Sequence, residues 1–139
     1  HPQMQGERGG GPAVRIEMAD DLPTVLGDVD YLKEAVAQIF DNACRFTPDD
    51  GVVTVTTGSD DEQRAWLEIR DSGPGIAEAD LPHIFQTFWR GDKAHSTPGF
   101  GLGMSIAQKI VELHNGTIEI ESQPNHGSSF RIKLPASAV

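Results

Sequence analysis

Cysteine and cationic side chains are scarce in this 139-residue chain, which contains one cysteine and 11 lysines and arginines against 21 aspartates and glutamates. A single cysteine excludes an internal disulfide framework and a cysteine-rich zinc site. The formal net charge of -10 argues against a nonspecific nucleic-acid binder, because such proteins need a basic face that displaces counterions from phosphates. A small polyanionic ligand is compatible with this charge where a metal ion or a few local cations offset the repulsion.

Long hydrophobic runs are also missing. No apolar segment approaches the roughly 18 residues that a membrane helix needs, and no secretory leader pattern is visible. We therefore expect a cytoplasmic domain without membrane contact. The length suits one domain, with an expected extent of 13–136. The glycine-rich residues 1–12 are typical of a flexible linker or cloning remnant, and 137–139 would form a short tail.

Apolar periodicity predicts the order strand, helix, strand pair, glycine turn, loop, helix, strand pair. The first helix is expected to start at an aspartate N-cap, Asp28 or Asp30, and to run to about Phe46, because Pro48 stops it. The first strand alternates charged side chains with apolar ones that should face inward, namely Val14, Ile16 and Met18. The other expected elements are strands at 52–57, 64–71, 117–122 and 128–134, helices at 78–85 and 102–113, and a possible strand fragment at 24–27.

This order of elements constrains the architecture. Consecutive strands joined by short turns must be antiparallel. With only two long helices, the simplest packing places both on one face of a single sheet. We therefore predict a two-layer α/β sandwich with a mixed, mostly antiparallel sheet.

The first predicted helix carries a polar flank beside its apolar face, formed by Gln38, Asn42 and Arg45. Such a flank is often only a solvated surface. The alternative is a ligand site in which Asn42 offers a carbonyl oxygen to a hard cation and Arg45 contacts phosphate. Mg²⁺ would suit such a site, because it takes few protein ligands and keeps waters and phosphate oxygens.

Two glycine-containing segments are further candidates. DSGPGI (71–76) follows a predicted strand, so that Asp71 could accept a hydrogen bond from a flat base lying against the glycine backbone. GFGLG (99–103) precedes a helix, and exposed amides at a helix start form an anion cradle. This segment has neither the lysine of a P-loop nor the spacing of a dinucleotide-binding fold. Taken alone, either segment could be an ordinary turn or cap.

Taken in order, these motifs resemble the catalytic ATP-binding domain of sensor histidine kinases. The same superfamily includes type II topoisomerases, mismatch-repair ATPases and the ninety-kilodalton heat-shock chaperone. The resemblance implies a Bergerat-type ATP-binding fold that uses ATP and Mg²⁺. The matching segments are QIFDNACRFTP (38–48), DSGPGI (71–76), FQTFWRGD (85–92), GFGLGMSIA (99–107) and the closing hairpin at 116–135.

The resemblance implies roles for the matching positions. Asn42 would coordinate Mg²⁺, whereas Arg45 and Arg90 would contact phosphates, and these three are the catalytic candidates. Asp71 would accept the adenine amino group. The remaining binding candidates are Phe46, Gly73, Gly75, Ile76 and, through water, Ser129 around the base, with Gln38, Lys93, Gly99, Gly101, Leu102 and Gly103 near the phosphates and metal.

Gln38 departs from the family pattern. ATP-hydrolysing members of the superfamily place a glutamate general base there, and most histidine kinases place an asparagine. Glutamine cannot abstract a proton, which favours a kinase over a hydrolase. None of the five histidines lies in a phosphoacceptor pattern.

The acceptor histidine is therefore expected on a separate dimerisation domain of the parent protein. The resemblance implies a response-regulator receiver as a further partner, and ATP and ADP as ligands. It also implies a parent protein that could be membrane-anchored. The alternatives are an anti-sigma-type serine kinase, a slow ATP hydrolase and a non-enzymatic nucleotide-binding module.

Overall fold

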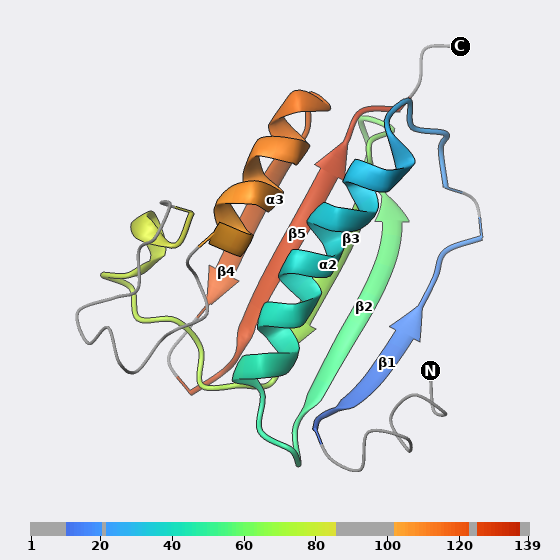
Figure 1. The fold of residues 1–139 in the computed structure, drawn as a ribbon. Coiled ribbons are helices and arrows are strands. Elements are labelled where there is room, and N and C mark those ends of the chain that lie inside the picture. Colours follow the sequence, from blue (N-terminus) through green and yellow to red (C-terminus); the bar gives the residue numbers. More distant parts are fainter. Residues whose placement is uncertain (1–10, 21, 86–101, 123–124, 137–139) are drawn as a thin grey trace.

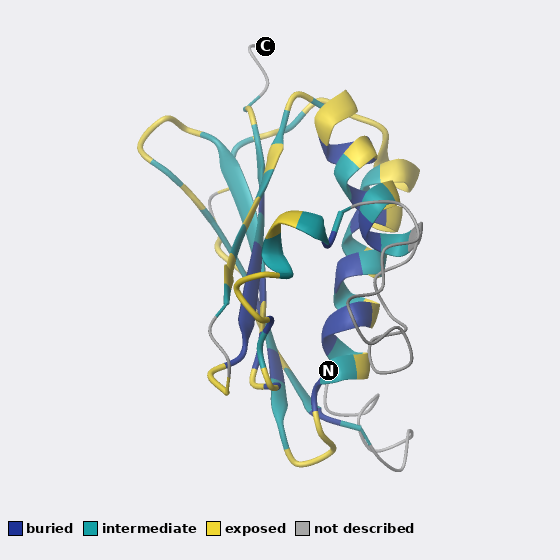
Figure 2. Ribbon diagram, turned by 90° about the vertical axis from the view of Figure 1, so that its left-hand side faces the viewer, coloured by how far each residue is buried: buried dark blue, intermediate teal, exposed yellow. Residues whose placement is uncertain are grey.

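The computed structural model describes residues 11–20, 22–85, 102–122 and 125–136. Two helices cover one face of a five-stranded sheet, and no described helix covers the other face, called the open face below (Figures 1 and 2). This arrangement is the predicted two-layer α/β sandwich. The elements in chain order are β1 (Ala13–Glu17), α2 (Val29–Phe46), β2 (Val52–Ser59), β3 (Ala65–Asp71), the 3-10 helix η1 (Leu81–His83), α3 (Leu102–Leu113), β4 (Thr117–Ser122) and β5 (Ser128–Leu134).

The sheet has the strand order β1-β2-β3-β5-β4, so the last strand in the chain is an inner one. The β1–β2 pair is parallel, and the other three pairs are antiparallel, as expected for a mixed sheet. β3 is the middle strand and pairs with β5, where Ile69 is opposite Phe130. β3 ends and β5 begins beside the carboxyl-terminal end of α2 (Figure 1).

Helix α2 begins and ends at the expected residues. The Asp28 side chain accepts a hydrogen bond from the backbone N–H of Tyr31 at 3.1 Å and thereby caps one of the free amides of the first turn. The last helical residue is Phe46, and the hydroxyl and N–H of Thr47 both donate to the carbonyl of Ala43. The amphipathic stripe of α2 buries Ala35, Ile39, Asn42 and Ala43.

The core lies between the helices and the sheet. Its largest fully buried side chains are Ile39, Ile69, Ile84, Met104, Val53 and Val111. Cys44, the single cysteine of the chain, is partly buried and packs against this cluster. In the described part of the chain, none of the helices is long and apolar enough to cross a bilayer.

Strand β1 differs from its expected burial. Ile16 is opposite Val55 in the parallel register and therefore points to the helical side, as predicted. It nevertheless remains 51% exposed, because β1 is an edge strand that lies beyond the cover of α2 (Figure 1). Met18 follows the end of the strand and is 60% exposed. The alternating pattern thus predicted correctly which face of the sheet Ile16 points to, but it predicted wrongly that this side chain would be buried.

Two other expected elements are reduced or absent. Residues 24–27 form no strand. The helix expected at 78–85 is only the three-residue helix η1. Pro82 lies within this segment, and it has no N–H to donate into a helical turn.

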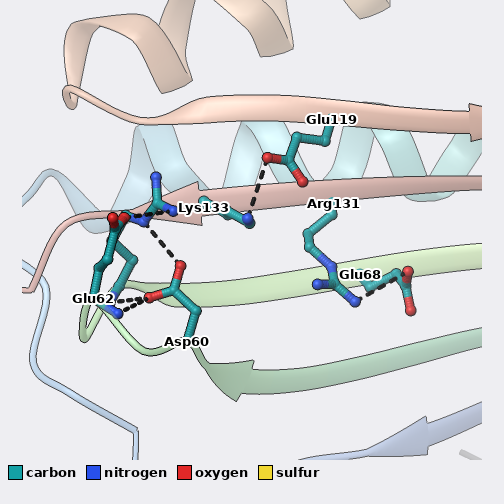
Figure 3. Close-up of polar contacts among 7 residues, drawn as sticks. Asp60, Glu62, Glu68, Glu119, Arg131 and Lys133 are labelled. Carbon is teal, nitrogen blue, oxygen red and sulfur yellow. Dashed lines mark hydrogen bonds and ion pairs between the residues drawn. The ribbon is translucent and has the colours of Figure 1, made fainter.

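The open face of the sheet carries a ladder of charged side chains (Figure 3). Glu68 forms an ion pair with Arg131 at 3.4 Å, and Glu119 forms one with Lys133 at 3.2 Å. The Arg131 guanidinium also lies 4.2 Å from the ring centroid of Trp66. These cross-strand contacts explain how a sheet face without helices tolerates water.

Candidate functional site

A cavity of about 160 Å³ lies between the end of α2, the end of β3, the start of β5 and the glycine turn that follows β3. Its wall is mostly apolar and carries few polar groups, which is the usual composition of a small-molecule site. The lining residues are Asn42, Ala43, Phe46, Asp71, Pro74, Gly75, Ile76, Ala77, Asp80, Ser128 and Phe130.

Asp71 is the buried carboxylate of this cavity, with 7% of its surface exposed. Its Oδ1 accepts the N–H groups of Gly73 at 2.9 Å and Ser128 at 3.3 Å. Burial raises the pKa of Asp71, and the two N–H bonds oppose that shift only in part. Both bonds end on Oδ1, and no hydrogen bond from the described residues reaches Oδ2, which is therefore the candidate acceptor for a ligand. Asp71 therefore presents an acceptor of fixed orientation.

The glycine turn at 72–76 lies close to its neighbours and needs residues without side chains. A Cβ on Gly73 would lie 2.8 Å from the Phe46 carbonyl oxygen, and Gly75 has a φ of +81°. The turn is also bonded to the segment between β4 and β5, since Asn125 N–H donates to the Pro74 carbonyl at 2.6 Å. The floor of the cavity is thus held from two parts of the chain.

Asn42 contributes a buried amide, 3% exposed, to the same cavity. Its Oδ1 accepts a hydrogen bond from the Arg45 guanidinium at 3.0 Å, so this oxygen already faces a cation. Its Nδ2 is buried and has no partner among the described residues, which is an uncommon and costly state for an amide. A hard cation at Oδ1 and an anionic ligand near Nδ2 would fit these two atoms.

The chain matches the family model of histidine kinase-, DNA gyrase B- and HSP90-like ATPases over residues 27–138. The chain belongs to this family. The adaptive-response sensory kinase SasA of Synechocystis sp. is 35% identical over 122 residues, which are 88% of this chain and 32% of SasA. SasA of Synechococcus elongatus is 34% identical over 119 residues, 86% of this chain and 31% of that protein. The chain thus spans about a third of the curated relatives it matches.

Solved structures of histidine kinases share the fold. The mycobacterial sensor histidine kinase MprB has a TM-score of 0.76 and 31% identity, covering 99% of this chain and 91% of that one. Full-length ShkA in complex with AMPPNP has a TM-score of 0.80 and 25% identity, covering 98% of this chain and 28% of that one. These similarities identify the chain as an ATP-binding catalytic domain of the histidine kinase type.

In this histidine kinase-type domain, Gln38 lies one helical turn before Asn42. Its amide nitrogen donates to Glu34 at 2.5 Å. A Cβ on Gly103, near the start of α3, would lie 2.5 Å from Gln38 Oε1. Gln38 therefore lies at the close approach of the two helices, and its neutral amide is no base.

The structure brings together much of the predicted site. Asn42, Phe46, Asp71, Gly75 and Ile76 all line the cavity, Gly73 donates to Asp71, and Arg45 contacts Asn42. Leu102 is the first residue of α3, and Gly103 follows it. The predicted phosphate contacts Arg90, Lys93, Gly99 and Gly101 lie outside the described residues.

Ser129 is located elsewhere than the resemblance implied. Its hydroxyl donates to Glu68 at 2.6 Å on the open face of the sheet, whereas Ser128 lines the cavity. The two-residue period of a strand explains the difference, because Ser128 shares a face with the buried Phe130. Alternation counted back from Phe130 would have found Ser128 in the sequence.

Proposed function

We propose that this domain binds MgATP with its adenine in the cavity beside Asp71 and supplies the γ-phosphoryl group to a histidine on a separate dimerisation and phosphoacceptor domain. The observation that carries the proposal is the buried Asp71 carboxylate, whose Oδ1 is held by two backbone N–H groups while Oδ2 has no hydrogen bond from the described residues. An exocyclic amino group, as in adenine, is a donor that matches this acceptor. The AMPPNP complex of ShkA supports a nucleotide as the ligand.

We assign functional roles to the polar residues in and beside the cavity. Asp71 accepts the adenine amino group, and Ser128 replaces Ser129 as the hydroxyl near the base. Asn42 holds Mg²⁺ through Oδ1, while Arg45 moves its guanidinium from that oxygen to a phosphate. When bound, Mg²⁺ neutralises phosphate charge. The proposed phosphate contacts are Arg90, Lys93, Gly99, Gly101, Leu102 and Gly103.

The proposed reaction requires little acid–base catalysis by this domain. A neutral imidazole nitrogen attacks the γ-phosphorus, a P–N bond forms, the bond to ADP breaks, and the imidazole later loses its proton. Catalysis is then mainly positioning and charge neutralisation. The neutral Gln38 agrees with a domain that does not activate water. A response-regulator receiver is the proposed next acceptor, and the proposed location is the cytoplasm.

Calorimetric titration of ATP, AMPPNP and ADP, with and without Mg²⁺, tests the proposal when phosphate release is assayed in parallel. We expect micromolar binding, about -8 kcal/mol, with negligible release. Steady release would instead indicate a hydrolase, and no binding at millimolar nucleotide would contradict nucleotide binding altogether. An added phosphoacceptor domain should then become labelled on histidine. An acid-stable phosphoserine on a partner would favour the serine kinase alternative.

Asn42→Ala should abolish the dependence of ATP affinity on Mg²⁺, because the substitution removes the amide oxygen that faces the Arg45 guanidinium and is the proposed metal ligand. The measurement compares dissociation constants in Mg²⁺ and in EDTA for both proteins. Asn42→Asp is the matched control, since it keeps an oxygen at that position. Equal Mg²⁺ dependence in Asn42→Ala and wild type would remove Asn42 from the metal site.

ATP affinity should fall as the pH is lowered through the acidic range. The pKa of Asp71 is raised by burial, so this carboxylate takes up a proton at a higher pH than an exposed aspartate and then loses its acceptor character. Phosphate protonation also affects binding, but it acts equally in an Asp71→Asn protein. The difference between the two pH profiles is therefore the Asp71 contribution. Parallel profiles would show that Asp71 does not contact the base.

A further inference from the structure

A second carboxylate lines the nucleotide cavity. Asp80 and Asp71 are the two charged residues among the described residues of its wall. Asp80 is half-buried and immediately precedes η1, a position where an aspartate usually accepts a backbone N–H of the first turn. It makes no such bond, because Pro82 has no N–H and the N–H of His83 donates to the Asp80 backbone carbonyl at 2.9 Å. The local sequence thus leaves the Asp80 carboxylate without a helix amide to cap.

The backbone that carries Asp80 is nevertheless held in the wall of the cavity. The Asp80 N–H donates to the Ala77 carbonyl at 2.9 Å, and the N–H of Ile76 donates to Ser122 Oγ at 2.6 Å. Ile76 and Ala77 line the same cavity. Asp80 therefore has a defined place in the wall, while no described residue forms a hydrogen bond or an ion pair with its carboxylate. Such a group in a small-molecule site is a candidate for contact with the ligand.

The chemistry of a carboxylate restricts which part of the ligand Asp80 can contact. A carboxylate accepts hydrogen bonds and donates none, and like charge repels it from phosphates. MgATP offers it the adenine amino group, the metal ion and the two ribose hydroxyls. In the proposed complex the amino group bonds to Asp71 and the metal ion to Asn42. The ribose hydroxyls are the donors that remain.

We propose that Asp80 is a specificity-determining residue that accepts hydrogen bonds from the ribose hydroxyls, so that the site selects ribonucleotides over deoxyribonucleotides. A carboxylate suits this task, because its two oxygens can accept from neighbouring hydroxyls, as acidic residues do in dinucleotide-binding folds. This inference rests on the proposed function, because it assumes that the nucleotide occupies the cavity.

The test measures, by calorimetry, the dissociation constants of ATP, dideoxyATP and ITP for the 139-residue chain and its variants. DideoxyATP lacks both ribose hydroxyls, and ITP has a carbonyl in place of the amino group. Wild type should prefer ATP over dideoxyATP about tenfold or more, the scale of a hydrogen bond to a charged group. Asp80→Ala should lose most of this preference and keep the wild-type preference for ATP over ITP.

Two further variants are the controls. Glu78→Ala removes a carboxylate from the same segment, but Glu78 is exposed and is not part of the cavity wall, so both preferences should stay at their wild-type values. Asp80→Asn keeps the size of the side chain and a neutral acceptor oxygen, so its preference for ATP over dideoxyATP should be intermediate. If Asp80→Ala does not fold, Asp80→Asn decides the question.

Several outcomes would overturn the inference. An unchanged preference for ATP over dideoxyATP in both Asp80 variants would remove Asp80 from the ribose. A loss of Mg²⁺ dependence in Asp80→Ala with that preference intact would assign Asp80 to the metal, and a reduced preference for ATP over ITP would assign it to the base. A wild-type chain that binds ATP and dideoxyATP equally contradicts this inference alone, whereas one that binds no nucleotide contradicts the proposed function.

Discussion

Asp71→Asn should weaken ATP binding by about 1.5–3 kcal/mol, the scale of a hydrogen bond to a charged group, or roughly ten- to a hundredfold. The substitution keeps the size of the side chain. An asparagine Oδ1 can still accept from Gly73 and Ser128, but Nδ2 replaces the available oxygen Oδ2. A donor then faces the adenine amino group, which is also a donor. Calorimetric titration of ATP into both proteins measures the difference.

ITP and the stability of the fold are the controls for this substitution. ITP carries a carbonyl where ATP has the amino group, so Asp71→Asn should bind ITP no worse than wild type does. Because burial raises the pKa of Asp71, its ionised form opposes folding, a contribution that appears as the pH rises through that pKa. Asp71→Asn should therefore be at least as stable as wild type at neutral pH. Equal losses of ATP and ITP affinity would contradict the role of Asp71.

Gly127→Ala should lower the free energy of unfolding by about 2–5 kcal/mol, the sum of a left-handed backbone penalty and a steric overlap. Gly127 has a φ of +82°, and a Cβ there would lie 2.1 Å from the Asp71 carbonyl oxygen. That atom is backbone at the end of an inner strand, so it cannot rotate away. Urea denaturation measures the loss as a lower midpoint at unchanged slope.

Asn125→Ala separates the two contributions to the Gly127→Ala effect. Asn125 lies in the same turn and also has a positive φ, +68°, so its replacement tests backbone conformation in the same place. We expect a loss of about 1 kcal/mol or less, since asparagine and alanine differ modestly in that region. A Gly127→Ala loss no greater than that of Asn125→Ala would show that the turn relaxes away from Asp71.

The sequence predicts the central elements well because each has a local cause. The Asp28 cap and Pro48 determine the bounds of α2, and the second hairpin appears at 117–122 and 128–134 as predicted. Burial at the sheet edge could not be predicted. Ile16 lies in a strand with the alternating pattern of a covered strand, but the helices do not cover this edge and Ile16 remains exposed. Whether a strand is covered depends on the position of α2, which no local pattern of β1 contains.

The candidate site shows the same division between local and long-range information. Asp71 and its two glycines are recognisable within six residues, and Asn42 within one helix turn of Arg45. The contacts of the Ser122 hydroxyl with Ile76 and Ser128, a residue of the cavity wall, have no local signal, because these partners are 46 and 6 residues away in the chain. These contacts depend on the register of β4 against β5, which only the folded sheet specifies.

The inner position of β5 also has a consequence for synthesis on the ribosome. β3 lies between β2 and β5 in the sheet, yet β5 is the last of the described strands to be synthesised. Until Leu134 has left the exit tunnel, α3 lacks the surface formed by Phe130 and Ile132, two core residues. The nascent domain therefore cannot close gradually from its amino terminus. A stalled chain that ends before Ser128 would expose the apolar side of α3 and be a substrate for chaperones and proteases.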